Sequence, residues 1–159
     1  MSSQFRLGVA TLATAAAMWV GAAFADWPFA TQVARLEPGY GGVCEQCDLS
    51  GRILVGARMT NAVFRRTNFS RAILTRANAA NSVFDFANFD DADMTDSKFV
   101  GARLRGASFR NALMDGANFS AADLRAAEAL TQRQLSAACG DDRTLLPRGL
   151  SIPHCGSKS

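Results

Sequence analysis

Four cysteines are the residues of this chain with the clearest chemistry. Cys44 and Cys47 form a C-x2-C motif, and Cys139 and Cys155 form a C-x15-C motif near the other end. Three uses fit these positions: a disulfide within each motif, a zinc site made by all four thiolates, or thiol–disulfide exchange at the first motif. The choice depends on the compartment of the protein and on the distance at which the fold holds the two motifs.

Other reactive side chains are few. His154 is the only histidine and lies beside Cys155 in a proline-rich tail, so we interpret it as a solvated loop residue. Asp90, Asp91 and Asp93 could suggest paired carboxylates, but the repeat described below predicts that they face solvent. The sequence has no G-x-S-x-G motif and no glycine-rich phosphate loop. We therefore predict a protein that is not an enzyme, with no catalytic residue, metal site or cofactor.

The first 25 residues have the pattern of a secretory signal. One positive side chain, Arg6, precedes an apolar run from Leu7 to Gly21, and the segment closes with Ala23-Phe24-Ala25, an A-x-A cleavage pattern. An uncleaved membrane anchor is the alternative, but the run is rich in Ala and Gly and barely long enough to span a bilayer. We expect cleavage after Ala25, no stable membrane anchor, and a periplasmic or secreted protein in which disulfides persist.

The composition restricts the class of partner. The chain has 159 residues, and 17 Lys and Arg residues against 14 Asp and Glu residues give a net charge of +3. This length suits one domain with a short appendage. A charge so close to zero argues against a polycationic nucleic-acid arm and against a strongly acidic, DNA-like surface. We therefore expect no nucleic-acid partner.

A period of five residues governs the chain from residue 49 to residue 124. Every fifth position is Leu, Phe or Met except Ala79, and a small residue, most often Ala, lies two positions earlier. Arg52 is the one large residue at such a small position. The large central residues are Leu49, Leu54, Met59, Phe64, Phe69, Leu74, Phe84, Phe89, Met94, Phe99, Leu104, Phe109, Met114, Phe119 and Leu124.

A five-residue period matches neither a helix nor a strand. The large and the small residue can both point inward if the chain turns a corner every five residues, so that four sides close a square coil of twenty residues. Stacked coils would pair their backbones about 4.8 Å apart, which gives about four coils in a stack roughly 19 Å tall. We expect Arg52 to leave the first coil open or irregular, and Ala79 to leave a small void or to be covered from adjacent coils.

The runs Ala-Asn-Phe, Ala-Asp-Leu and Ala-Asp-Met resemble the pentapeptide-repeat proteins, whose pattern is A-(D/N)-L-x-x. The resemblance covers about half of the chain and implies an all-β fold, a right-handed quadrilateral β-helix. It also implies that the ending from Ala137 to Cys155 is a C-terminal cap. Because family members often dimerise through the C-terminal end, a monomer and a homodimer both stay open. The family is specific for fold and says little about function.

The repeat and its flanks divide the chain into four parts: a signal peptide at 1–25, a linker or N-terminal cover at 26–43, the β-helix at 44–128 and the C-terminal cap at 129–159. Within the cap, Thr131-Gln132-Arg133-Gln134 has the form of a capping box. It predicts a short helix over about 131–139 that Gly140 ends, followed by an irregular tail.

The predicted height of the stack bears on the cysteines. It separates the two motifs too far for one zinc ion, since Zn–S bonds are about 2.3 Å long. We therefore favour two disulfides, of which Cys139–Cys155 would staple the tail to the helix. Cys47 also occupies an inward small position, so its pairing with Cys44 stays open.

Residues twenty apart should lie one above the other in such a stack. Opposite charges then align, for example Arg71 with Asp91, which predicts a ladder of surface ion pairs. Some outward positions are apolar, and Phe86 aligns with Arg66 for a cation–π contact. Either the segment 27–40 covers these columns or they form a surface for a partner or for self-association. The candidate interaction residues are Ile53 and Ile73 on one face, Val63 and Val83 on the opposite face, and the outward pair Phe86 and Arg66.

Three functions stay open. The first is an exported, non-enzymatic scaffold or interaction module for an unknown protein or cell-envelope partner, and we favour it. The second is a redox role through Cys44 and Cys47. The third is DNA mimicry, as a resemblance to the quinolone-resistance pentapeptide proteins that protect topoisomerase would imply. Those proteins are long, strongly acidic cytoplasmic dimers, and this chain departs from them in predicted compartment, charge and length.

Overall fold

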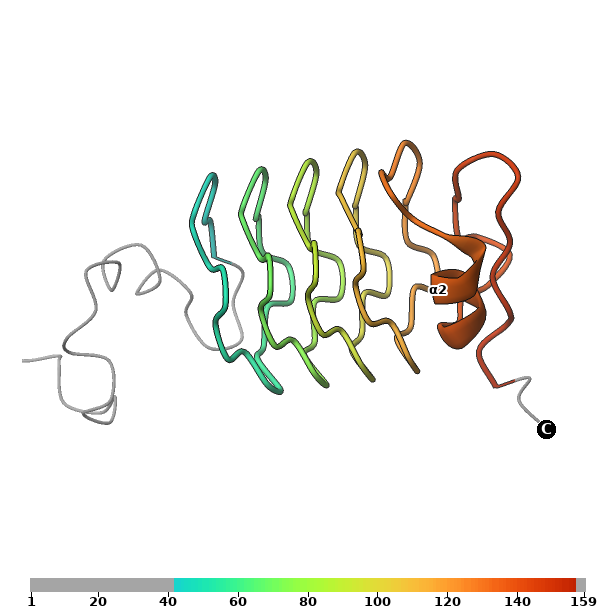
Figure 1. Ribbon diagram of the computed structural model, residues 1–159, viewed down its shortest axis with the longest axis horizontal. Coiled ribbons are helices and arrows are strands. Elements are labelled where there is room, and N and C mark those ends of the chain that lie inside the picture. The colour runs from blue at the N-terminus through green and yellow to red at the C-terminus, as the bar shows by residue number, and fades with distance from the viewer. Residues whose placement is uncertain (1–41, 157–159) are drawn as a thin grey trace, which may run out of the picture. The chain divides into compact units, whose positions relative to one another are not determined.

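The computed structural model describes residues 42–156 and shows a stack of coils with a C-terminal cap at one end (Figure 1). Parallel β-bridges join residues twenty apart, from Val43–Val63 to Ser108–Glu128. We number the coils 1 to 4, over residues 43–62, 63–82, 83–102 and 103–122. Val43 already belongs to the ladder, so the predicted linker ends too late. The remainder of that linker and the predicted signal peptide lie outside the described residues.

Each side of a coil ends in a tight turn. The amide of Ala72 donates to the carbonyl of Phe69 at 3.0 Å, and Arg71 between them has a φ of 59°. This hydrogen bond, with a left-handed residue at the third position, defines a type II turn. The left-handed residue recurs at every fifth position from Gln46 to Ala126. Coil 1 has the same turns and bridges as the others, so the expectation that Arg52 would open it is wrong at the level of the backbone.

The Asn and Asp residues of the repeat hold these turns in place. The side-chain oxygen of Asn68 accepts a hydrogen bond from the amide of Ser70 at 3.0 Å, and Asn88 does the same for Asp90 at 2.8 Å. A short side chain that accepts from the backbone two residues later is a local device that favours a turn. The polar position of each repeat therefore encodes the corner that follows it.

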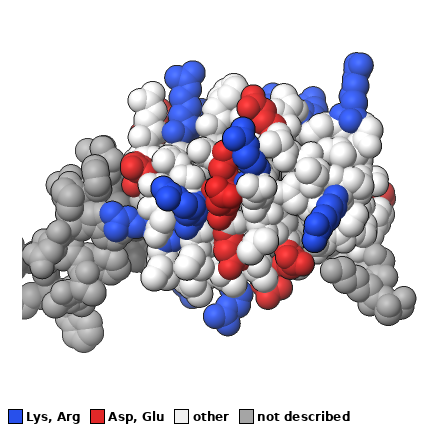
Figure 2. Space-filling view, in the orientation of Figure 1, with Lys and Arg blue, Asp and Glu red and all other residues white. Residues whose placement is uncertain are grey.

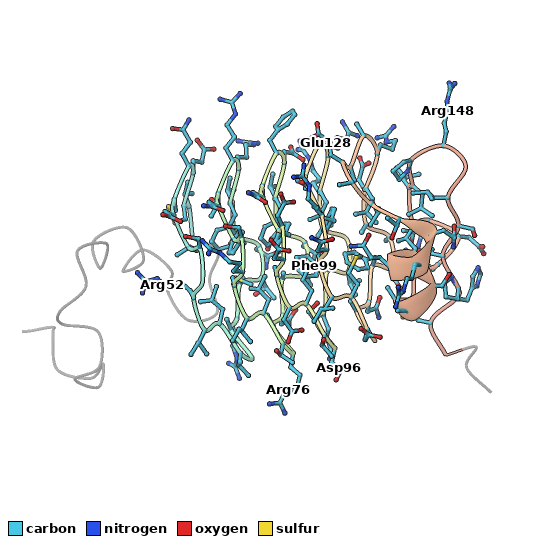
Figure 3. All side chains as sticks on the ribbon, viewed as in Figure 1. Arg52, Arg76, Asp96, Phe99, Glu128 and Arg148 are labelled. Atoms are coloured by element: carbon cyan, nitrogen blue, oxygen red, sulfur yellow. A yellow bond between two sulfur atoms is a disulfide. The ribbon has the colours of Figure 1, made fainter. Side chains whose placement is uncertain are left out.

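The interior is a set of continuous columns of apolar side chains. All seven phenylalanines at repeat centres are fully buried, and Ala79 is fully buried as well. Rings twenty residues apart stack in parallel, for example Phe69 on Phe89 with centroids 5.1 Å apart. Phe99 is seen pointing into this interior in Figure 3. Burial of each ring contributes about 1.5–3 kcal/mol, so the core supplies much of the stability.

A short helix begins the cap. The helix α2 spans Gln132–Ala137, and Thr131 is its N-cap. The capping box is complete, because the Thr131 hydroxyl accepts from the amide of Gln134 and the Gln134 side chain accepts from the amide of Thr131. Leu135 lies fully buried against the end of the core.

After α2 the chain returns to the ladder. Cys139 bridges Asn118, and Leu145 bridges Asp123. The helix therefore ends before the predicted residue 139, since Ala138 is already extended at φ −92° and ψ −175°. Gly140 is not a left-handed helix cap, contrary to prediction. It is buried, and a Cβ there would lie 2.9 Å from Cγ2 of Ile152.

Two acidic side chains stabilise the end of the stack where the cap begins. Asp123 is 8% exposed and pairs with Arg125 and Arg105, and hydrogen bonds from these arginines lower its pKa. Asp141 accepts from the amide of Ala121 at 2.8 Å, and this bond is the main cause that lowers the pKa of Asp141 to about 2. Both carboxylates are thus favoured in their charged form by the folded state.

Substitution of the corner glycines tests how closely side chains of adjacent coils pack at the corners. Gly56 and Gly106 have nearly equal φ values of 64° and 65°, but a Cβ on Gly56 meets nothing within 4 Å, whereas one on Gly106 lies 2.7 Å from the Phe86 ring. We expect Gly56→Ala to lose about 1 kcal/mol of unfolding free energy through the left-handed backbone alone. Gly106→Ala should lose about 1 kcal/mol more, because the ring must move. Urea denaturation measures both, and equal losses would contradict this packing.

Acid should weaken the cap in a defined pH window. The folded pKa of Asp141 lies below the unfolded value of about 3.9, so its contribution is complete above pH 4 and is lost as the pH falls towards 2. We expect Asp141→Asn to be less stable than the parent protein at pH 7 and to lose less of its melting temperature between pH 4 and pH 2. Asp115→Asn, which removes an exposed carboxylate, is the control. Parallel pH profiles for the parent and Asp141→Asn would refute the assignment.

Candidate functional site

The cysteines form two disulfides. Cys44 bonds to Cys47 at the start of coil 1, and Cys139 bonds to Cys155, which ties the last rung of the ladder to the tail. Cys44 and Cys47 are only 2% and 5% exposed. Reactive cysteine pairs are partly exposed and lie in electropositive surroundings, so this burial is typical of a structural disulfide.

The other side chains singled out for chemistry are held in surface contacts. Asp90 accepts a hydrogen bond from Ser108, and Asp91 accepts one from Asn111 at 3.1 Å. Nε2 of His154 lies 3.0 Å from a carboxylate oxygen of Asp142. Among residues 42–156 no group of three or more His, Cys, Asp or Glu side chains is placed to hold a metal ion. Within the same range no helix has the length and hydropathy needed to cross a membrane.

The predicted interaction residues fall on two separate surfaces. Val63 and Val83 are bridged and only partly exposed, and the corner that follows them carries Arg66 and Phe86. The guanidinium of Arg66 lies 6.0 Å from the centroid of the Phe86 ring, which is 62% exposed. Phe86 has a φ of 59°, which is strained for a bulky residue. A depression of about 220 Å³ beside this ring is lined by Glu45, Gln46, Arg65, Arg66 and Phe86.

The second surface, half a coil away, is a column of side chains that is aliphatic except for Asp93. Bridges join Ile53 to Ile73, Ile73 to Asp93 and Asp93 to Leu113. Ile53 is 76% exposed and Leu113 is 54% exposed, and Val55 beside Ile53 is exposed as well. We call Ile53, Ile73, Leu113 and Val55 the apolar face. Leu113 and Val55 were missed by the sequence analysis, although Leu113 lies forty residues after Ile73 and so shares its stacking register.

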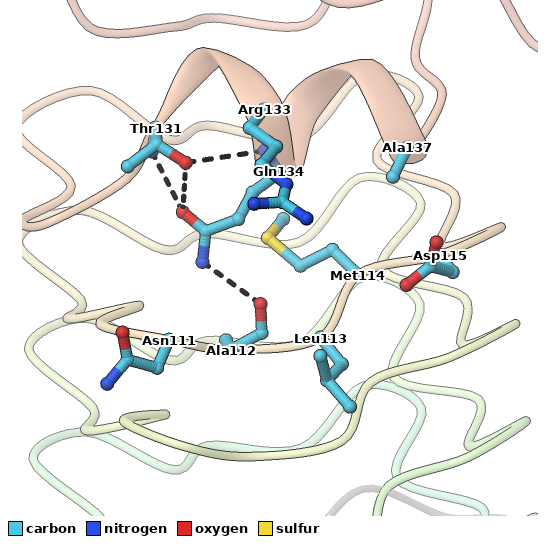
Figure 4. Close-up of a pocket in the computed structure, with 9 residues that line it drawn as sticks. All are labelled: Asn111, Ala112, Leu113, Met114, Asp115, Thr131, Arg133, Gln134 and Ala137. Carbon is cyan, nitrogen blue, oxygen red and sulfur yellow. Dashed lines mark hydrogen bonds between the residues drawn. The ribbon is translucent and has the colours of Figure 1, made fainter.

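The apolar face ends at a pocket under α2. This pocket has a volume of about 410 Å³ and lies between residues 111–115 of coil 4 and the helix (Figure 4). Its apolar lining comes from Leu113, Met114 and Ala137, and Arg133 adds a cation. No pattern in the sequence indicated it, because it exists only where α2 replaces a side of the next coil. It offers an apolar cavity with one positive group, Arg133, and one negative group, Asp115, which suits binding rather than acid–base catalysis.

Charge is arranged in bands along the stack. Figure 2 shows acidic side chains gathered between basic ones. Coil 3 carries five Asp residues and Lys98, and coil 2 carries four Arg residues and no acid. Arg76 and Asp96 point away from the coils at neighbouring corners in Figure 3. The four arginines of coil 2 are Arg65, Arg66, Arg71 and Arg76.

The ion pairs differ from the predicted ladder. Arg103 pairs with Asp85, and Arg105 with Asp123, which are spacings of eighteen rather than twenty. In each pair a bridge residue of one coil meets the first turn residue of its neighbour. Arg65–Glu45 is the ion pair at a spacing of twenty among residues 42–156, and no Arg71–Asp91 pair is found there. The bands therefore leave coil 2 with a positive surface.

A family model describes most of this ladder. The model of pentapeptide repeats matches residues 44–78, 72–111 and 102–129, in eight copies. No curated protein matches the chain.

Solved structures with related coils are distant in sequence. QnrB1, a plasmid-mediated fluoroquinolone resistance protein, is 21% identical over 63% of this chain and 61% of its own, with a TM-score of 0.46. The pentapeptide repeat protein alr5209 from Nostoc Pcc 7120 is 23% identical over 65% of this chain and 77% of its own, with a TM-score of 0.40. Rfr23 from the cyanobacterium Cyanothece 51142 is 17% identical over 74% and 95%, with a TM-score of 0.32.

This chain thus spans only 60% and 61% of two of the QnrB1 structures that it resembles. The family model, in contrast, covers more than half of the chain, over the residues that form the bridges and corners described above. The chain therefore belongs to the pentapeptide-repeat family, whose fold is the right-handed β-helix.

Proposed function

We propose that this protein is an exported, non-enzymatic scaffold that binds a protein or cell-envelope partner through its apolar face. The observation that carries the proposal is the column of exposed aliphatic side chains, headed by Ile53 at 76% and Leu113 at 54% exposure. Exposed apolar side chains gathered on a rigid support, here with Asp93 between Ile73 and Leu113, are typical of an interaction surface. The buried core and the paired backbone of coils 1–4 hold that patch in a fixed shape, which lowers the entropic cost of binding.

The two alternative functions receive less support. A redox role needs an accessible thiolate, and Cys44 and Cys47 are buried in a disulfide. A DNA mimic needs a continuous acidic surface, whereas the acidic coil 3 adjoins the basic coil 2 and the whole chain carries +3.

Export is the first part of the proposal to test. Expression of the whole chain in a bacterium should place the protein in the periplasm, with a mass that begins at Asp26 and with four cysteines that resist alkylation until they are reduced. These disulfides would be stable there because the compartment is oxidising. Intact-mass analysis with and without reduction gives the answer. An uncleaved chain with free thiols in the cytoplasm would contradict export.

Binding through the apolar face is the second part. Ile53→Lys and Leu113→Lys should each lower the capture of a crosslinked envelope partner about tenfold, because a charge in the centre of an apolar contact is costly. Val43→Lys is the matched control: Val43 is also a bridge residue of coil 1, is 58% exposed and lies on the opposite side. Quantitative capture measures the effect. If Val43→Lys reduces capture as much as Ile53→Lys does, the apolar face is not the site.

A further inference from the structure

One rung of the ladder is incomplete at the pocket under α2. In every other repeat from Cys44 to Leu124, the amide of the central residue donates to the carbonyl of the bridge residue in the next layer. On neighbouring sides of coil 4, Phe109 donates to Glu128 and Phe119 donates to Cys139. Within residues 42–156, the amide of Met114 has no acceptor, because α2 occupies the place of the next strand.

The helix replaces only part of the missing strand. Nε2 of Gln134 donates to the carbonyl of Ala112 at 3.0 Å, where a strand amide would otherwise donate. The carbonyl of Ala137 accepts from the amide of Gly116 at 2.9 Å. What α2 does not supply is an acceptor for Met114, a residue that is only 1% exposed. A buried amide without a protein partner costs free energy, so an acceptor that enters here gains a hydrogen bond without displacing another protein group.

The pocket walls define the chemistry of that acceptor. Met114 and Arg133 both line the pocket, and Figure 4 draws the guanidinium of Arg133 next to the side chain of Met114. A carboxylate has two acceptor oxygens, and a charge-assisted bond to an arginine is stronger than a neutral one. Leu113 and Ala137 offer apolar contact beside it, while Asp115 at the far end disfavours a second negative charge.

We propose that this pocket binds the C-terminal carboxylate of a peptide whose last residue is apolar. One carboxylate oxygen accepts from the amide of Met114, the other accepts from Arg133, and the last side chain lies on Leu113. The inference rests on the proposed function and specifies the chemistry of its partner. Leu113 belongs both to the pocket and to the apolar face, so the preceding residues of the peptide lie along that face.

The length of the contact follows from the coil spacing. Ile73 lies two coils before Leu113, which is about 10 Å at 4.8 Å per coil. An extended chain advances about 3.3 Å per residue, so three or four residues reach from the pocket to Ile73. A tetrapeptide is therefore a sufficient probe, and a free aliphatic acid lacks the part that lies on the face.

The test is a titration of the ¹⁵N-labelled, oxidised protein followed by NMR. The probes are an acetylated tetrapeptide of three alanines and a C-terminal leucine, the same peptide with a C-terminal amide, and 4-methylpentanoate. The acid peptide should move the Met114 amide resonance downfield and saturate it, and the amidated peptide should bind about tenfold more weakly. Arg133→Gln should weaken the acid peptide by a similar factor. Arg148→Gln, whose side chain points away from the cap in Figure 3, should not.

Three outcomes overturn the inference. The first is no shift of the Met114 amide resonance at saturation, and the second is equal binding of the acid and amidated peptides. The third is binding of 4-methylpentanoate as tight as that of the tetrapeptide, which would remove the peptide as the source of the carboxylate.

Failure of the proposed function is seen separately. Partner capture that depends on Ile53 without tetrapeptide binding refutes only the pocket. Tetrapeptide binding with capture indifferent to Ile53→Lys and Leu113→Lys refutes only the apolar face as the binding site.

Discussion

The five-residue side is the constraint on which the rest of this structure depends. A side so short has room for one bridge residue, one central side chain and one turn, and the turn requires left-handed backbone at its third position. Left-handed backbone costs free energy for residues other than glycine, and the Asn and Asp side chains that accept hydrogen bonds from the turn amides offset part of that cost. The remainder is offset by parallel ring stacking in the core, where Phe69, Phe89 and Phe109 form one continuous column. Neither element is stable alone, and each coil needs its neighbours.

This geometry separates structural roles from surface roles by position in the repeat. Central and small residues are buried, so they are restricted to shapes that fill the interior. Bridge and corner residues face outward, so their chemistry is free to vary, as Ile73, Asp93 and Leu113 show within one column. The cap interrupts this regularity at one side only. A helix in place of a strand leaves a cavity at the end of the apolar face. The two ends of that face therefore differ, because only the end at the cap has a cavity.

The fold could be predicted because periodicity reports directly on backbone geometry. The same register predicts that Ile73 lies above Ile53 and that Arg66 lies against Phe86, and the structure has both contacts. Side-chain partners were harder to predict. Arg103 meets Asp85 rather than Asp123, since long side chains reach diagonally and register alone does not give their direction. The amide of Met114 is unpaired because α2 takes the place of the next strand on that side, and the repeat pattern does not indicate which side the helix replaces.

The glycines at the corners limit which substitutions the sequence can accept at other corners. Gly106 leaves room for the ring of Phe86, and Gly116 leaves room for the carboxylate of Asp96, each twenty residues earlier. A substitution at either member of such a pair changes what the other position tolerates. Positions far apart in the chain should therefore accept mutations in a set order, with the smaller residue fixed first and the larger one acquired afterwards. Although the surface of the stack is exposed, the residue tolerated at one corner thus depends on the residue twenty positions away in the same column.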